Sequence, residues 1–272
     1  SDLPILSTIT SKIFGTLLAR PCPISKEKKE MTKVQDRLIV ALDFPTGQEA
    51  RALVEELGDA VTFYKVGMEL FYSEGPAIVS YLKEQGKKVF LDLKLQDIPN
   101  TVAHSLAVLT RLGVDIMNVH AVGGPKMMAE GMNAIREAAE KLCVAAPKLI
   151  AVTILTSMDE AQWAPLGYAK PIGEEVLALA ALAKESGLSG VVASPREAEA
   201  IRKACGSDFL IVTPGIRPTW AAANDQSRIA TPSMAMKNGS THLVVGRPIT
   251  KAENKIDAVN RILKEMEGAL HE

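Results

Sequence analysis

The sequence has 272 residues, 47% of them hydrophobic, and a formal net charge of −1. This length suffices for one sizeable core, and the balanced charge gives no reason to expect binding to nucleic acid. No apolar run approaches the roughly 20 residues that span a bilayer, so we expect no membrane partner. Cys22, Cys143 and Cys205 are scattered and odd in number. They form no disulfide framework and favour a reducing, cytoplasmic compartment.

Residues 1–35 differ from the rest of the chain. Apolar side chains near helical spacing precede Pro21 and Pro23, and a charged run follows from Ser25 to Lys33. We expect a leader, tag or partner-binding extension with a linker. A fused tag, a packing helix and a targeting sequence all stay open, the last because Lys12 and Arg20 faintly resemble a transit peptide. The main domain is expected to cover residues 36–272.

From residue 37 onward, short β-rich runs alternate with longer helical patterns. The expected strands are 37–43, 61–66, 88–93, 115–119, 149–154, 190–193, 209–212 and 242–245. The expected helices are 48–57, 75–84, 102–112, 126–142, 173–185, 196–204, 233–237 and 256–266. Eight βα units within about 235 residues predict an α/β protein with a closed (β/α)₈ TIM barrel. An open doubly wound sheet is the main alternative, but residues 43–47 are not its Gly-rich first turn.

An acid and a base interrupt the third expected strand. Asp92 and Lys94 are two residues apart and therefore point to one side of a strand, while the alternating leucines point to the other. Strands of an α/β protein are normally apolar throughout, so charges on the inward face cost stability and suggest chemistry. A buried structural ion pair is the alternative that this spacing leaves open. Asp97 follows where the backbone is expected to turn.

Polar residues also gather at the expected carboxyl ends of the other strands, where barrels of this class carry active sites. One polar strand end has little meaning, but a ring converging on one mouth is a strong signal. The members of this ring are Asp43, Lys65, Asn118, His120, Thr153, Thr156, Ser157, Thr213, Gly246 and Arg247.

The end of the last strand is a candidate phosphate site. The Gly246 amide stands next to Arg247, and barrels often bind phosphate with the loops after strands seven and eight. A backbone amide and a guanidinium group suit a dianion. The preceding loop, 214–231, is long and polar, as lids often are. A surface turn whose arginine pairs with an acid is the alternative.

Five separated motifs resemble those of the orotidine 5'-phosphate decarboxylase family over residues 36–267. They are Leu42-Asp43 and the runs Asp92 to Thr101, Thr213 to Pro218, Asp225 to Pro232, and Val245 to Thr250. Each is modest evidence alone, whereas all five in this order are specific. The resemblance implies conversion of orotidine 5'-phosphate to uridine 5'-phosphate and carbon dioxide in de novo pyrimidine biosynthesis. It also implies a homodimer with shared active sites and no metal or organic cofactor.

The resemblance implies roles for the matching residues. Lys94 would protonate C6 of the pyrimidine as carbon dioxide leaves, with Asp92 against the substrate carboxylate. Lys65 and Asp43 would hold the ribose hydroxyls, and Asp97 would reach into the partner's site as a further catalytic residue. The remaining substrate contacts would come from Ile98 and Thr101 near that interface, Ser157 and Pro214 at the base, Gln226 between base and phosphate, and Gly246 with Arg247 at the phosphate.

Two positions depart from the family's pattern. Gln96 stands where the family usually has His, and we expect its amide to support the site from beyond Lys94. Lys255 stands where the family often has Pro before the last helix, and we expect a local effect.

Two other functions stay open. A magnesium-dependent sugar-phosphate decarboxylase of the same suprafamily shares the Asp-x-Lys-x-x-Asp spacing but needs an additional acid, which is not evident beside Lys65. The non-enzymatic alternative is an oligomeric assembly scaffold that binds a further partner through residues 1–35. Methionines at 127, 128, 132, 234 and 236 keep a remodelled surface possible, although Met at helical spacing is more often part of a core.

Overall fold

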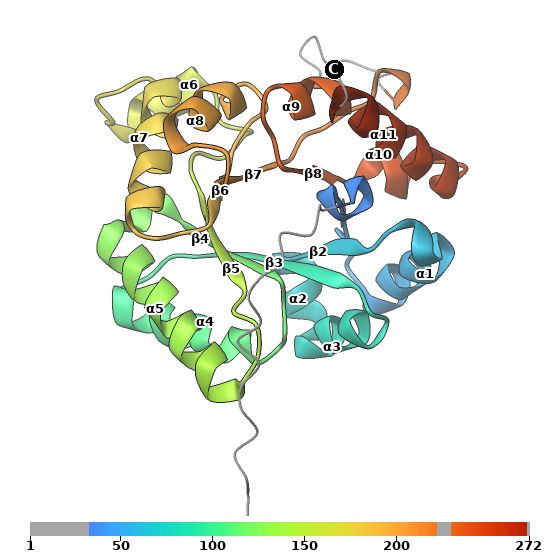
Figure 1. Cartoon of the computed structure of the whole chain (residues 1–272), viewed down its shortest axis with the longest axis horizontal. Coiled ribbons are helices and arrows are strands. Elements are labelled where there is room, and N and C mark those ends of the chain that lie inside the picture. The colour runs from blue at the N-terminus through green and yellow to red at the C-terminus, as the bar shows by residue number, and fades with distance from the viewer. Residues whose placement is uncertain (1–32, 222–229, 271–272) are drawn as a thin grey trace, which may run out of the picture. The chain divides into compact units, whose positions relative to one another are not determined.

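Eight parallel strands close into a barrel in the computed structural model, which describes residues 33–221 and 230–270 (Figure 1). Each strand pairs with its neighbours in chain order, and β8 pairs with β1. The predicted (β/α)₈ barrel is therefore confirmed. The strands are β1 (Leu38–Ala41), β2 (Phe63–Gly67), β3 (Lys88–Leu95), β4 (Ile116–His120), β5 (Lys148–Val152), β6 (Gly190–Val192), β7 (Leu210–Thr213) and β8 (His242–Val245).

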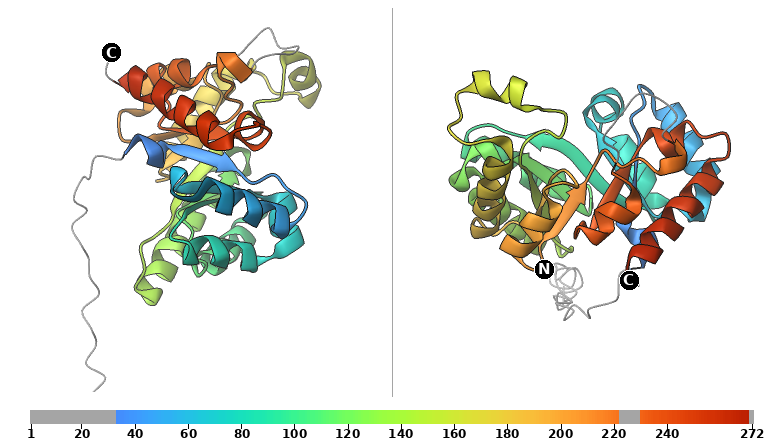
Figure 2. Two further views of the ribbon diagram at one scale, coloured as in Figure 1. Left: turned by 90° about the vertical axis from the view of Figure 1, so that its right-hand side faces the viewer. Right: turned by 90° about the horizontal axis from the view of Figure 1, so that it is seen from above.

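Helices follow the strands and surround the barrel (Figure 1). The longer ones are α1 (Gly47–Leu57), α2 (Met68–Glu74), α3 (Pro76–Glu84), α4 (Pro99–Thr110), α5 (Pro125–Leu142), α7 (Ile172–Glu185), α8 (Ala198–Cys205) and α11 (Lys255–Leu270). Shorter ones are α6 (Glu160–Trp163), α9 (Pro232–Lys237) and α10 (Arg247–Thr250), with 3₁₀ turns η1 (Val34–Arg37), η2 (Gly58–Ala60), η3 (Ala121–Gly123), η4 (Ala164–Leu166) and η5 (Thr219–Ala221). The last helix, α11, packs against η1, so the red and blue segments of the barrel lie side by side (Figure 2).

One helix was not expected. After β2 the sequence predicts a single helix over 75–84, which corresponds to α3, but α2 precedes it and has Gly75 as its C-cap. Gly75 has a φ of 62°, which favours glycine, and Pro76 then opens α3 with the fixed φ that suits a first helical position. The apolar residues of α2 continue the β2 pattern too closely for the sequence to separate them.

Side-chain alternation sorts the buried residues into two layers. On β1, Ile39 and Ala41 belong to a cluster built mainly from strands, whereas Leu38 and Val40 join a larger cluster that includes the helices. The first cluster therefore fills the barrel interior and the second lies between strands and helices. The interior cluster consists of Ile39, Ala41, Phe63, Phe90, Ile116, Ile150, Val212 and Val244.

This interior layer positions the site. Phe63 and Phe90 point inward, and the next inward residues toward the carboxyl end are Lys65 on β2 and Asp92 on β3. The same alternation that packs the apolar floor therefore places charges above it. The predicted opposite orientation of the β3 leucines is also confirmed, since Leu91 and Leu93 join the outer cluster.

Residues 1–32 of the expected extension lie outside the described residues, so the boundary near residue 36 stays a prediction. The methionines considered for a partner surface are mostly core: Met127, Met128, Met132 and Met236 are buried, and Met234 is 49% exposed. None of the helices within residues 33–221 and 230–270 combines the length and hydrophobicity of a membrane-spanning segment.

Candidate active site

A cavity of about 280 Å³ opens at the carboxyl ends of the strands. Its lining residues belong to, or closely follow, all the strands except β4. The charged members are Asp43, Lys65, Asp92 and Lys94, and all of them come from the first three strands. The mouth predicted from strand-end polarity is therefore a real hollow with four converging charges.

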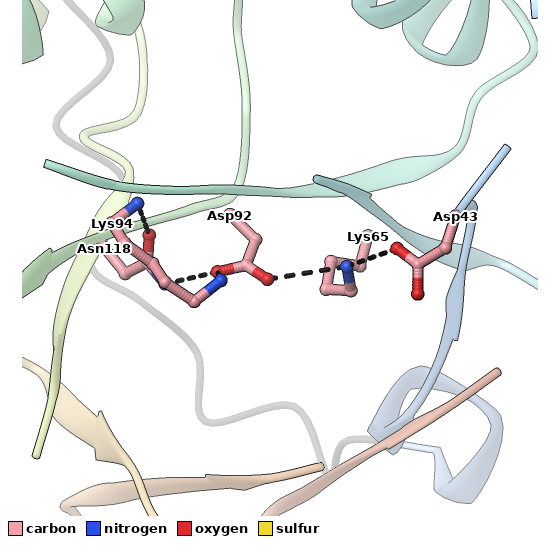
Figure 3. A network of polar contacts seen from close by, with 5 residues as sticks. All are labelled: Asp43, Lys65, Asp92, Lys94 and Asn118. Atoms are coloured by element: carbon pink, nitrogen blue, oxygen red, sulfur yellow. Dashed lines mark hydrogen bonds and ion pairs between the residues drawn. The ribbon is translucent and has the colours of Figure 1, made fainter. Parts of the chain in front are cut away.

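These four side chains form one continuous row (Figure 3). The Lys65 ammonium lies 2.8 Å from Asp43 Oδ1 and 3.4 Å from Asp92 Oδ2. The Lys94 ammonium donates to Asp92 Oδ1 at 2.7 Å. Because the charges alternate in sign along the row, each buried charge faces an opposite one, which offsets much of the cost of removing it from water.

Asp92 is the buried centre of the row. Burial alone would raise the pKa of its carboxyl group, but Lys65, Lys94 and the Asn118 amide hold that pKa below its ordinary value. Asn118 donates to Asp92 Oδ1 at 2.7 Å. A structural ion pair would need one lysine, whereas here two lysines share one carboxylate and both line the cavity.

Lys94 sits on an irregular backbone. Its φ of 52° is left-handed, one of two such non-glycine residues in the described chain. The β3–β4 register shifts across it: Leu91 pairs with Met117 and Leu95 with Val119, so four steps along β3 match two along β4. Such irregularities re-aim side chains at the rims of barrels. Period-two alternation predicts the correct side for Lys94 but not this distortion.

His120 ends β4 beside the row. Burial lowers the pKa of its imidazole, and Lys94 lowers it further, while Asp92 acts in the opposite direction. A neutral His120 adds no third cation to the row at neutral pH. Among residues 33–221 and 230–270, no group of three or more His, Cys, Asp or Glu could hold a metal ion.

The far side of the cavity is neutral. Pro214 lines it after β7 and Gly246 lines it after β8, and their expected roles at the base and the phosphate stay predictions. Arg247 lines a neighbouring cavity of about 380 Å³ together with Arg217 and Lys251. No acid is among the described residues that line this second cavity. Three cations around one hollow suit an anion and argue against a surface turn in which Arg247 pairs with an acid.

Other predicted residues lie outside this lining. Asp97 and Ile98 lie on the segment that joins β3 to α4, where Asp97 is exposed and Ile98 is 66% exposed, and Thr101 is exposed in the first turn of α4. Asp97 Oδ1 accepts the Ile98 N–H at 2.6 Å. After β5, Thr156 lines the cavity, whereas the predicted Ser157 is exposed beside it. A single chain therefore assembles only part of the predicted set.

Gln96 and Lys255, which depart from the family's pattern, and the loop residue Gln226 differ in what the structure shows of them. Gln96 is exposed one residue past β3 and is not among the lining residues. Lys255 opens α11, and its ammonium lies 3.0 Å from Glu56 Oε1 on α1. That this departure has only a local effect stays a prediction. Gln226 lies outside the described residues, and its role stays a prediction.

Sequence reasoning gave Asn118 no role beyond a polar strand end. In the structure it is buried, contacts Asp92, and accepts the Lys94 backbone N–H at 2.8 Å. Its inward register on β4, two residues after the interior Ile116, was the available signal. What the sequence does not reveal is that the neighbouring strand bulges toward it.

Comparison with known proteins gives a consistent match over the barrel. The model of the orotidine 5'-phosphate decarboxylase / HUMPS family matches residues 36–262. Orotidine 5'-phosphate decarboxylase of Syntrophomonas wolfei is 48% identical over 86% of this chain and 99% of its own length. The Moorella thermoacetica enzyme of that name is 49% identical over 86% of this chain and 93% of its own. The crystal structure of orotidine 5'-phosphate decarboxylase from Lactobacillus acidophilus superposes with a TM-score of 0.76 at 42% identity, covering 84% of this chain and 98% of that one.

Proposed function

Because the chain belongs to the orotidine 5'-phosphate decarboxylase / HUMPS family and converts orotidine 5'-phosphate to uridine 5'-phosphate in pyrimidine biosynthesis, we propose that the row from Asp43 to Lys94 performs this reaction. The observation that carries the assignment is the Asp92 carboxylate held between the Lys65 and Lys94 ammonium groups at the wall of the cavity. The enzyme is a carboxy-lyase, so its chemistry centres on one carbon–carbon bond.

Breaking that bond releases carbon dioxide and leaves an electron pair on C6 of the pyrimidine. Lys94 stabilises the developing charge as a preorganised cation and then donates a proton to C6. In this proposal Asp92 lies against the substrate carboxylate, and repulsion between the two anions is relieved as carbon dioxide leaves. Electrostatics and one proton transfer complete the reaction, and no step in this sequence calls on a metal or an organic cofactor.

Binding falls to the remaining residues. Lys65 and Asp43 present a charge-assisted pair, 2.8 Å apart, for the ribose hydroxyls. Gly246 lines the central cavity, and Arg247, the next residue, lines the cation-lined one, which suits a phosphate dianion. Ser157, Pro214 and Gln226 stay assigned to the base and its link to the phosphate.

We also propose that two copies of the chain share their active sites. One exposed apolar side chain follows each of strands β2 to β5 at the mouth end, where a partner would cover it: Met68, Ile98, Val122 and Leu155. Asp97, beside Ile98, and Thr101, in the first turn of α4, are also exposed, and neither lines the cavity of its own chain. A second copy would receive these residues.

The activity test is direct. Purified chain is mixed with orotidine 5'-phosphate, and the loss of the substrate's ultraviolet absorbance is followed with and without a metal chelator. We expect turnover that the chelator leaves unchanged. Absence of turnover would overturn the assignment, and loss of turnover only with chelator would favour the magnesium-dependent alternative.

The shared site has its own experiment. The variants Lys94→Ala and Asp97→Ala are each expected to be nearly inactive. In a mixed dimer, one of the two sites receives both intact residues, so unfolding the two proteins together and refolding them should restore activity. With random pairing, half of the dimers are mixed, and each mixed dimer has one intact site of two. About a quarter of the parent activity should therefore return if the active site is shared within a dimer. No recovery, together with a monomeric size in solution, would contradict the dimer.

The free thiols at 143 and 205 accord with our expectation of a cytoplasmic location.

A further inference from the structure

Asn118 is a buried polar residue on β4 that contacts the charged row. It is the third residue of β4 and is 1% exposed, and its side chain points into the barrel, as Ile116 does two residues earlier (Figure 3). It does not line the cavity. A role in contacting substrate is therefore excluded by position, and its contacts must explain why a polar side chain is buried there.

Its amide makes two hydrogen bonds to the two central residues of the row. Nδ2 donates to Asp92 Oδ1 at 2.7 Å, and Oδ1 accepts the backbone N–H of Lys94 at 2.8 Å. Only this orientation satisfies both partners, because the opposite one would set oxygen against carboxylate and N–H against N–H. One rigid group thus fixes the distance between the carboxylate and the peptide that carries the lysine.

The second of these bonds stands in for a missing strand contact. Across the β3–β4 irregularity the ladder skips from Leu91 to Leu95, and the Lys94 N–H lies within the gap. Lys94 also has the left-handed φ of 52°. Residues held in such conformations persist only where their surroundings over-determine them. Asn118 supplies that restraint from the neighbouring strand.

We infer that Asn118 is a positioning residue of the decarboxylation, which holds the Asp92 carboxylate and the strained Lys94 backbone in one fixed relation. The inference rests on the roles proposed above for Asp92 and Lys94. Other side chains would not serve. Aspartate would place a second anion against Asp92, and leucine would leave the partly buried Lys94 N–H without this partner.

The test compares three purified variants with the parent: Asn118→Ala, Asn118→Asp, and the control Asn133→Asp, an exposed asparagine on α5. We expect Asn118→Ala to lower kcat about 100-fold, because misplacement by about 1 Å costs that much. KM should change less than about threefold, since no substrate contact is lost. The control should match the parent in both constants.

The Asn118→Asp variant gives a second, independent readout. At neutral pH its carboxylate repels Asp92, and kcat should fall at least as far as in Asn118→Ala. As the pH is lowered, the introduced carboxyl group takes up a proton that it can donate to Asp92, as the amide does. Relative to the parent at the same pH, the kcat of this variant should therefore rise toward acid pH. A residue with only a structural role would give no such recovery.

Thermal unfolding of each variant shows whether the protein is folded, and if Asn118→Ala is not, the Asn118→Asp pH profile decides. The inference is overturned if folded Asn118→Ala keeps kcat within about threefold of the parent, if its KM rises in step with any loss, or if the Asn118→Asp deficit is independent of pH. An inactive parent would instead refute the proposed function. If the parent is active and Lys94→Met is inactive, the proposed function stands. A negative result with the Asn118 variants then refutes only the role of Asn118.

Discussion

The two ends of the barrel both carry lysine–aspartate pairs, and they differ in burial and in the number of partners. At the bottom, the ammonium of Lys88 lies 3.0 Å from Asp36 Oδ2, and these side chains are 43% and 23% exposed. At the mouth, two lysines share Asp92, whose side chain is 11% exposed. Strand β3 contributes to both, with Lys88 at its start and Lys94 near its end.

The difference teaches where charge is structural and where it is functional. Water can replace either member of the bottom pair, so that pair has little effect on stability. The charges at the mouth cannot be rehydrated as easily, and one of them rests on a left-handed backbone. Such an arrangement is not the most stable filling of a barrel. It persists where the carboxyl ends of the strands bind and transform a substrate.

The largest expected effect comes from removing the mouth lysine. Lys94→Met keeps the aliphatic stem and deletes the cation that stabilises and protonates C6. We expect kcat to fall by about 10⁴-fold or more, since electrostatic stabilisation and proton transfer are lost together. The measurement is steady-state turnover of orotidine 5'-phosphate.

Lys88→Met is the matched control for this change, because it removes the same cation from the other end of the same strand. Its kcat should stay within about twofold of the parent. Comparable losses in both variants would mean that β3 tolerates neither substitution structurally, and the contrast between the two ends would fail.

A smaller effect is expected at the phosphate side of the mouth. Arg247→Ala removes one cation of the second cavity, and a charge-assisted hydrogen bond contributes about 1.5–3 kcal/mol. We expect kcat/KM to fall about 10–100-fold, mainly through KM.

Lys255→Ala on α11 is the control for the phosphate side, because that lysine already pairs with Glu56. It should leave KM unchanged. An unaltered KM in Arg247→Ala would move the phosphate away from the end of β8.

The contrast between the two ends also separates what the sequence could predict from what it could not. Alternation at Phe63 and Phe90 and the repeating βα pattern were sufficient for the barrel and for the inward side of Lys65, Asp92 and Lys94. These features depend on local periodicity, which the sequence carries directly.

Features that depend on two strands at once were not predictable. The register shift beside Lys94, the hydrogen bonds of Asn118 and the inclusion of Thr156 rather than Ser157 in the cavity lining follow from how neighbouring segments meet. The resemblance likewise assigns Asp97 and Ile98 to a site shared with a second copy, and this assignment stays a prediction, because it depends on how two chains meet.

At the bottom of the barrel, we expect acid to lower the stability of the protein by protonating His242. Its ring lies edge-on to Phe63, with centroids 6.0 Å apart, and burial together with nearby Lys148, Arg37 and Lys88 lowers the pKa of its imidazole to about 3. The unfolded chain takes up this proton near pH 6.5, as an ordinary histidine does. The contribution of His242 to stability is therefore complete above about pH 6.5 and is lost as the pH falls toward 3.

We expect this group to remove about 1–2 kcal/mol from the free energy of unfolding between about pH 7 and pH 5. His242→Phe cannot take up the proton and should flatten this part of the profile, whereas His104→Gln, at an exposed position on α4, should not. Urea unfolding at the two pH values measures the difference. An equal slope in parent and His242→Phe would show that other groups cause the acid sensitivity.

The smallest effect is expected for the stability of Lys88→Met itself. Its partner Asp36 keeps a hydrogen bond from the Thr62 hydroxyl at 2.9 Å and remains partly exposed to water. The free energy of unfolding should fall by no more than about 1 kcal/mol. Because salt screens exposed pairs, about 1 M sodium chloride should nearly abolish this difference from the parent. The kcat deficit of Lys94→Met should survive the same salt, since it arises from a missing proton donor and from a buried electrostatic interaction, which salt screens much less. Salt could instead reduce the kcat deficit of Lys94→Met as strongly as the stability loss of Lys88→Met. The charges at the mouth would then be as accessible to solvent as those at the bottom.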